Sequence, residues 1–156
     1  MSSGLVWHCW RFHELSVDRL YDVLALRCQV FIVEQGPYQD LDGVDRHSAH
    51  LLGRNSHGDL LAYLRVVDPG IKYPEASIGR VITAPKVRGT GLGRLLIREG
   101  VRRCHLAWPG RGIRISAQSH LQPFYTEVGF VGQGEDYLED GIPHREMLLA
   151  WPEGQS

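Results

Sequence analysis

The stretch that decides the fold is SIGRVITAPKVRGTGLGRLL, residues 77–96. Its first part, Ser77–Thr83, is rich in β-branched side chains and predicts a strand. A turn with three glycines follows at 88–93, and the apolar residues after it recur at helical spacing. This order of elements can bind phosphate, because the first turn of a helix exposes unpartnered backbone N–H groups and the positive end of the helix dipole. Glycine allows close approach and positive φ, and Arg88 adds a guanidinium.

Two other phosphate-binding motifs do not match the spacing. A P-loop ends in Gly-Lys-Ser/Thr, whereas Gly93 is followed by Arg94 and Leu95. A dinucleotide fingerprint has the spacing G-x-G-x-x-G after the first strand of a βαβ unit. Here the glycines stand at 89, 91 and 93, beyond the middle of the chain. From the residues alone, the turn is either an anion site or only a tight strand-to-helix connection.

The pattern outside this stretch predicts a mixed α+β chain in the order strand, helix, three strands, helix, strand, helix, two strands. Strands are expected at 6–14, 49–54, 60–67, 77–83, 113–117, 130–136 and 145–151, and helices at 17–31, 91–107 and 121–128. The first helix begins after the N-cap Ser16 and ends before Gly36-Pro37. The expected apolar face of the first helix consists of Val17, Leu20, Leu24, Cys28 and Phe31. That of the second helix consists of Leu92, Leu95, Leu96, Cys104 and Ala107.

The polar segment 36–48 predicts an acidic loop with Asp40, Asp42 and Asp45. A calcium-binding EF-hand needs Gly at its sixth position and Glu at its twelfth, and neither stands there when counting begins at Asp40. We interpret this segment as a solvated loop that attracts a cationic amine. His47 and His50 have no obvious third partner, so the sequence predicts no metal site.

Composition excludes several classes of protein. The 156 residues carry a formal net charge of −1, which disfavours a nucleic-acid-binding surface and fits one domain over 1–156. Cys9, Cys28 and Cys104 have no disulfide or zinc spacing, which favours a reducing compartment, and the last two are expected to be buried as small apolar residues. Without a signal-peptide pattern or an apolar run near ~18 residues, we expect a cytoplasmic protein that does not enter membranes. The apolar residues of 6–12 are compatible with a homodimer.

The segment 78–93 resembles the coenzyme A-binding motif of the GNAT superfamily of N-acetyltransferases, whose core pattern is Arg/Gln-x-x-Gly-x-Gly/Ala. Arg88, Gly91 and Gly93 match that pattern. Downstream, Gln118, then Phe124-Tyr125 and Gly129-Phe130, resembles the family's Asn-(x)6-Tyr followed by Gly-Phe, with Gln118 where Asn is commoner.

The resemblance extends from about residue 7 to 150 and narrows to the ElaA-like branch. Its signature stretches resemble 27–35 with Pro37-Tyr38, Ala117-Gln118, and 139–144. This likeness implies a GNAT fold, with a mostly antiparallel central sheet splayed between its fourth and fifth strands and helices on both faces.

The resemblance also implies where acetyl-coenzyme A (acetyl-CoA) binds. The pantetheine arm pairs with the exposed edge of the fourth strand, a backbone N–H near Ile82 stabilises the oxyanion, and the turn holds the pyrophosphate. The implied cofactor-binding residues are Val81, Ile82, Thr83, Arg88, Gly89, Thr90, Gly91, Leu92, Gly93, Arg94, Gln118 and Tyr125.

Acetyl transfer to an amine needs a neutral nucleophile, an oxyanion donor and a proton for the leaving thiolate. Tyr125 is the candidate general acid, and its alternative role is a core aromatic beside Phe124 and Phe130. The base is left open between Glu34, His144, His120 and proton loss to a water chain.

The sequence therefore predicts an N-acetyltransferase that uses acetyl-CoA as co-substrate, without a metal, and transfers the acetyl group directly in a ternary complex. The acceptor is a small-molecule or peptide amine that the sequence does not identify. Two alternatives stay open: transfer of a larger acyl group, and a coenzyme A-binding sensor or interaction module with the same fold.

Overall fold

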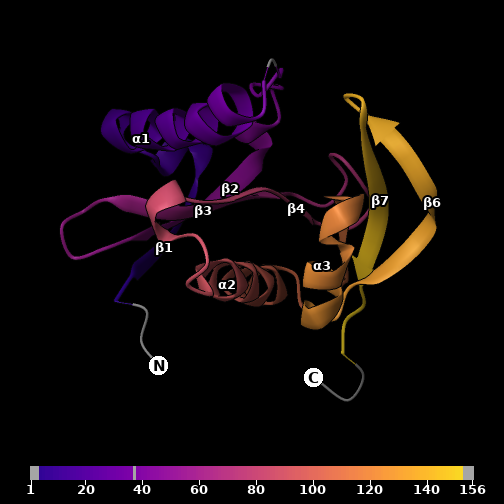
Figure 1. Cartoon of the computed structure of the whole chain (residues 1–156). Helices are drawn as coiled ribbons and strands as arrows, with labels where there is room; N and C mark the ends of the chain where they lie inside the picture. The colour runs from indigo at the N-terminus through magenta and orange to yellow at the C-terminus, as the bar shows by residue number, and fades with distance from the viewer. Residues whose placement is uncertain (1–3, 37, 153–156) are drawn as a thin grey trace.

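The computed structural model describes residues 4–36 and 38–152, and Figure 1 shows its arrangement. The strands are β1 (Val6–Arg11), β2 (Ser48–Arg54), β3 (Leu60–Val67), β4 (Ser77–Thr83), β5 (Ile113–Gln118), β6 (Val131–Glu139) and β7 (Ile142–Leu149). The helices are α1 (Val17–Cys28), α2 (Leu92–Ala107) and α3 (Gln122–Val128). A π-helical segment, Gln29–Glu34, continues α1. None of the helices in the described ranges is long and apolar enough to cross a membrane.

The strands form two antiparallel sheets, one in the order β1-β2-β3-β4 and the other in the order β5-β7-β6. They meet where Ala76 forms a parallel bridge with Ile113 and the N–H of Arg114 donates to the carbonyl of Ala76 at 2.9 Å. Within the described residues, no ladder joins β4 itself to β5. The splay between the fourth and fifth strands is therefore confirmed, and α1 and α2 lie on opposite faces of the first sheet (Figure 1).

Successive side chains of the central strands point to opposite faces and supply two cores. Leu51 and Leu64 pack on the side of α2, in the larger cluster. Leu52 and Tyr63 pack on the side of α1, with Val23 of that helix. All four strand side chains are fully buried, so β2 and β3 are fixed in the core on both faces, and β4 pairs with β3 at the edge of this sheet.

A bulge interrupts β4 in its middle. Tyr63 of β3 faces Ile82 and Arg65 faces Gly79, so that one β3 residue between them opposes two residues of β4, Arg80 and Val81. Arg80 has φ of 52°, in the left-handed region that residues with side chains adopt uncommonly. Bulges bend a strand and re-aim its side chains.

The effect of the bulge is visible on either side of it. Ile78 belongs to the core under α2, but Ile82, four residues later, belongs to the core under α1. In an uninterrupted strand these two residues would share a face. The bulge therefore turns the second half of β4 relative to the first, next to the point where β4 and β5 separate.

The predicted apolar face of the first helix is partly wrong. Val17 is 85% exposed and Cys28 is also exposed, whereas Val23 and Arg27 are buried. An arginine at a buried position cannot be seen in a pattern of apolar spacing. The α-helix also ends at Cys28 and continues as a π-helix to Glu34, which changes the periodicity. Pro37, at the expected helix end, lies outside the described residues.

Other boundaries also differ from the predictions. The first strand stops at Arg11, and a 3-10 turn occupies 12–14. The last two strands are longer than expected, because Asp140 and Gly141 adopt positive φ and join them in a tight hairpin. On α2, Cys104 is buried as predicted, but Leu95 is 41% exposed.

Candidate active site

A cavity of about 320 Å³ lies where β4 and β5 separate. Val81 of β4, Gln118 of β5, Tyr125 of α3 and His144 of β7 line it. The structure thus brings together residues that the sequence analysis placed in cofactor binding or catalysis. The volume lies within the range typical of small-molecule sites.

Tyr125 is both a core aromatic and a cavity residue. It is 8% exposed, and its ring makes edge contacts with Phe124 and Phe130, at centroid distances of 5.1 and 5.9 Å. Burial raises the pKa of Tyr125 to about 12, so the phenol keeps its proton at neutral pH. The two roles considered from the sequence are therefore compatible in one side chain.

His144 is oriented by the hairpin that carries it. Its Nδ1 lies 2.7 Å from the carbonyl oxygen of Ile142, which can only accept, so Nδ1 carries the proton of the neutral ring. Nε2 is then the acceptor atom, and a carboxylate oxygen of Glu139 lies 3.4 Å from it. In this tautomer Nε2 has a lone pair that can accept a hydrogen bond from a ligand in the cavity.

Further polar groups surround this pair, and sequence reasoning missed them. The hydroxyl of Ser116 on β5 is hydrogen-bonded to the hydroxyl of Tyr137 on β6, and it lies 3.5 Å from the carboxylate of Glu139. The ring of Tyr137 stacks on His144, with centroids 6.2 Å apart. The available signal was the Asp140-Gly141 hairpin, which brings Tyr137 opposite His144.

The glycine turn has the conformation that anion binding requires. Gly89 and Gly91 have φ of 80° and 83°, and Gly91 is the N-cap of α2. Apart from the adjacent residues, no heavy atom of the described part of the chain lies within 4 Å of where a Cβ would stand at either glycine, so the backbone is open to a ligand. The Thr90 hydroxyl donates to the carbonyl of Val87 at 2.6 Å and closes the turn.

Glu34 lies at this turn instead of in the cavity with Tyr125 and His144. Its carboxylate binds the Arg88 guanidinium through two contacts, at 2.6 and 3.0 Å. The hydrogen bonds from Arg88 lower the pKa of Glu34. A shallow hollow contains both residues, together with Val81 and Thr83. Val81 and Gln35 border the cavity as well, so the hollow adjoins the cavity and extends to Arg88 at the start of the glycine turn.

The register of β4 shows which amides face the open edge. The N–H of Ala84 donates to the carbonyl of Leu61 on β3 at 2.8 Å. Since successive N–H groups of a strand point to opposite edges, Ile82 also directs its N–H toward β3, and Thr83 directs its N–H away from it. An oxyanion donor near Ile82 is therefore a neighbour of Ile82 and not that residue itself.

Two predicted residues lie apart from the cavity. Arg94 is exposed and binds Glu127 of α3 through two contacts, at 3.1 and 3.2 Å. His120 is also exposed and does not line the cavity.

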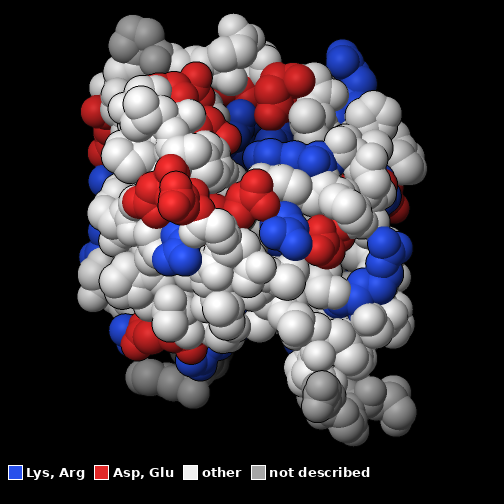
Figure 2. Space-filling model, turned by 90° about the vertical axis from the view of Figure 1, so that its right-hand side faces the viewer, with Lys and Arg blue, Asp and Glu red and all other residues white. Residues whose placement is uncertain are grey.

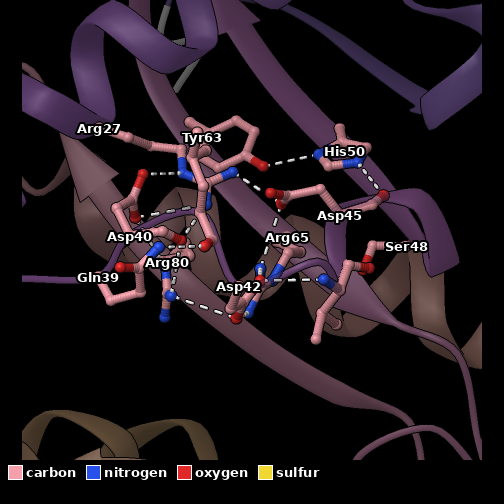
Figure 3. A network of polar contacts seen from close by, with 12 residues as sticks. Arg27, Gln39, Asp40, Asp42, Asp45, Ser48, His50, Tyr63, Arg65 and Arg80 are labelled. Carbon is pink, nitrogen blue, oxygen red and sulfur yellow. Dashed lines mark hydrogen bonds and ion pairs between the residues drawn. The ribbon is translucent and has the colours of Figure 1, made fainter.

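A buried ionic network lies behind the cavity and holds the bulge in place (Figure 3). Arg27 of α1 is 1% exposed and binds Asp40 at 3.0 Å and Asp45 at 2.7 Å. Arg80, the residue with positive φ, also binds Asp40, at 2.9 Å. The strained residue is thus tied to the helix through a shared carboxylate.

Arg65 completes the network from β3. Its guanidinium binds Asp42 at 2.9 Å and Asp45 at 3.1 Å, and Asp42 also contacts Arg80 at 3.3 Å. Hydrogen bonds from Arg65 outweigh partial burial and lower the pKa of Asp42 to about 2. The expectation of a solvated loop that attracts an amine is therefore wrong, because these carboxylates are neutralised by arginines distant in the sequence.

His50 belongs to the same network. Its Nδ1 lies 2.7 Å from the Tyr63 hydroxyl, and its Nε2 lies 2.9 Å from the carbonyl of Asp45.

Over residues 4–36 and 38–152, no group of His, Cys, Asp and Glu is arranged to hold a metal ion.

Comparisons with known proteins give a consistent result. The family model described as an acetyltransferase (GNAT) domain matches residues 26–150. Protein ElaA of Escherichia coli is 42% identical over 92% of this chain and 98% of its own length, and its crystal structure superposes with a TM-score of 0.85. An acyl-CoA N-acyltransferase from Pseudomonas aeruginosa is 42% identical, covers 94% of this chain and 99% of its own, and superposes with a TM-score of 0.88.

The network generates a test of stability. Replacing Arg27 by Met leaves Asp40 and Asp45 buried without one of their partners, which typically costs about 3–5 kcal/mol. We expect urea unfolding of the Arg27→Met variant to show a loss of this size in the free energy of unfolding. The control is Arg102→Met, whose pair with Glu99 is exposed and worth about 0–1 kcal/mol. Equal losses in the two variants would contradict the structural importance of the network.

Proposed function

The chain belongs to the GNAT acetyltransferase family, and from that premise we propose that it transfers an acetyl group from acetyl-CoA directly to a primary amine. The observation that carries this proposal is the continuity of the site. The cavity with Tyr125 and His144 meets, at Val81, the hollow that leads to Arg88 and the glycine turn. A thioester on a long phosphorylated arm fits such a path, with its reacting end in the cavity.

Each part of the path has a role toward acetyl-CoA. The glycine turn and Arg88 hold the pyrophosphate, through the N-terminal amides of α2 and a guanidinium. The pantetheine arm pairs with the open edge of β4, toward which Thr83 directs its N–H. A backbone N–H of this edge, next to Ile82, stabilises the tetrahedral oxyanion, a contribution typically worth about 2.7–4 kcal/mol.

His144 accepts the proton that the amine loses, and Tyr125 protonates the leaving thiolate. His144 has an acceptor nitrogen in the cavity and Glu139 beside it, whereas Glu34 is held by Arg88 at the turn. These contacts favour His144 over Glu34 as the base. Tyr125 holds its proton until a thiolate forms, because burial raises the pKa of its phenol. Attack and proton transfer occur in one ternary complex, so no covalent enzyme intermediate is needed.

Calorimetric titration with acetyl-CoA, followed by a thiol-release assay with a panel of primary amines, tests the proposal. We expect binding and amine-dependent release of coenzyme A. A folded sample that does not bind acetyl-CoA at high micromolar concentration would refute the proposal. Binding without thiol release would favour a sensor, and faster release from a longer acyl thioester would indicate a larger acyl donor.

Arg88→Gln tests the position of the pyrophosphate. We expect this substitution to weaken acetyl-CoA binding by about tenfold or more, because a charge-assisted contact is lost. Binding of S-acetylpantetheine, which has the thioester but no pyrophosphate, should not change. The matched control is Arg102→Gln, on the exposed surface of α2. If S-acetylpantetheine binding falls by the same factor, Arg88 does not act on the pyrophosphate.

Tyr125→Phe tests the general acid. The substitution keeps the ring contacts with Phe124 and Phe130 and removes only the hydroxyl. We expect kcat to fall about 10²–10⁴-fold, in the range of general acid–base catalysis, with little change in acetyl-CoA affinity. Steady-state kinetics and calorimetry measure the two quantities. Unchanged kcat would remove Tyr125 from the mechanism.

His144→Gln tests the base. In the parent protein, kcat/KM for the amine should fall on acidification, because a protonated imidazole cannot accept a further proton. The His144→Gln variant should have a lower kcat, and its kcat/KM should lack the part of the pH dependence that His144 causes. A Glu34→Gln variant is the comparison, and it should keep the pH profile of the parent. If Glu34→Gln changes the pH profile and His144→Gln keeps the profile of the parent, Glu34 is the base and His144 is not.

A further inference from the structure

The cavity is lined by both acidic and basic residues, and only some of them form ion pairs with other residues of the chain. Its acidic residues, Glu139 and Asp140, come from the β6–β7 hairpin, and its basic residues are Arg65, Lys72 and Arg80. Figure 2 shows the face that includes this hairpin, with basic side chains in a recess and acidic side chains beside them. An acceptor that enters here meets both kinds of charge.

The three cations of the cavity are not equivalent. Arg65 and Arg80 are bound by the aspartates of the buried network. Lys72, in the loop between β3 and β4, has no ion pair with any residue in the described parts of the chain. Its ammonium lies 5.7 Å from the centroid of the Tyr73 ring. Lys72 is exposed to solvent, so its ammonium can meet a ligand that enters the cavity. Desolvation by nearby atoms lowers the pKa of Lys72, and attraction to Glu139 opposes this shift.

Lys72 lies close to the proposed base through a chain of side chains. Tyr73, its neighbour, interacts electrostatically with Tyr137, and the ring of Tyr137 stacks on His144, with centroids 6.2 Å apart. Arg65 also lines this cavity. The Nε of Arg65 is buried, and within the described residues it has no hydrogen-bond partner. Lys72 and Arg65 therefore line the same cavity as the Glu139–His144 pair, which the hairpin carries.

We propose that the acceptor is a small primary amine that also carries a carboxylate, which Lys72 binds while the amine faces His144 and Glu139. The proposal rests on the proposed function and specifies its substrate class. An ammonium approaches Glu139 and His144, loses one proton to His144 and attacks the thioester carbonyl. As the C–N bond forms and the C–S bond breaks, Tyr125 protonates the coenzyme A thiolate, and the second proton lost by the nitrogen restores the phenol. The carboxylate takes no part in the bond changes and orients the acceptor. A polyamine would instead place a second positive charge near Lys72 and be repelled.

Matched acceptors test this inference. Glycine, β-alanine and 4-aminobutyrate each have an alkylamine counterpart of equal carbon number that lacks the carboxylate: ethylamine, propylamine and butylamine. Amine-dependent thiol release from acetyl-CoA gives kcat/KM for every member. We expect at least one carboxylated member to exceed its counterpart by about tenfold or more, because one charge-assisted contact is gained. The chain length with the largest ratio reports the spacing between the amine and the carboxylate.

Lys72→Met identifies the residue responsible. This variant should lose about tenfold in kcat/KM for the preferred carboxylated acceptor, through KM, and keep the value for its alkylamine counterpart. Lys72→Arg should retain most of the preference, and Arg102→Met should behave as the parent protein. Equal losses for both acceptor types, or no preference in the parent protein, would overturn the proposal.

The two proposals fail in different ways. If the protein binds acetyl-CoA and acetylates the alkylamines as efficiently as the carboxylated amines, the proposed function stands. Only the inference that the acceptor carries a carboxylate is then overturned. Absence of acetyl-CoA binding by folded protein would refute the proposed function and, with it, this inference.

Discussion

The structure depends on the buried contacts between three arginines and three aspartates that join α1, the loop after it, β3 and β4. Removing one member of a buried pair leaves a charge without compensation, so the contacts hold or fail together. One of the arginines, Arg80, occupies the bulge and has a positive φ that costs free energy. Its ties to Asp40 and Asp42 hold the strand in this conformation. The bent strand then leaves β5, and the cavity opens between them.

The same contacts decide which charges remain for chemistry. Asp42 and Asp40 form ion pairs with Arg65 and Arg80 and offset their charges. The cavity is therefore not dominated by positive charge, although three basic residues line it. The acidic, basic and histidine residues that line the cavity outside this network are Lys72, Glu139, Asp140 and His144. Catalysis requires reacting atoms to be held in a fixed geometry. The ion-pair network fixes the position of the strand that lines the cavity.

Arg88 has an ion pair of a different kind. Its side chain is 46% exposed and that of Glu34 is 32% exposed, so their contact is worth little free energy. A pyrophosphate offers the same planar guanidinium similar oxygen partners and more negative charge. In the proposed function it can therefore replace Glu34 at small cost. Arg27 cannot exchange its partners in this way, because its side chain is 1% exposed and a ligand cannot reach it.

The sequence by itself determined the elements whose signals are local. The strand Ser77–Thr83, the glycine turn and α2 were predicted closely, because β-branched runs, positive-φ glycines and helical spacing act over a few residues. Only the tertiary structure decided the rest. The aspartates of 40–45 look like a solvated loop until Arg27, Arg65 and Arg80 are brought to them from other elements. Glu34 and His144 were equal candidates until folding placed one at the turn and the other in the cavity. Long-range ion pairs and a bulge leave no periodic mark in a sequence, because they depend on residues that meet only when the sheet has formed.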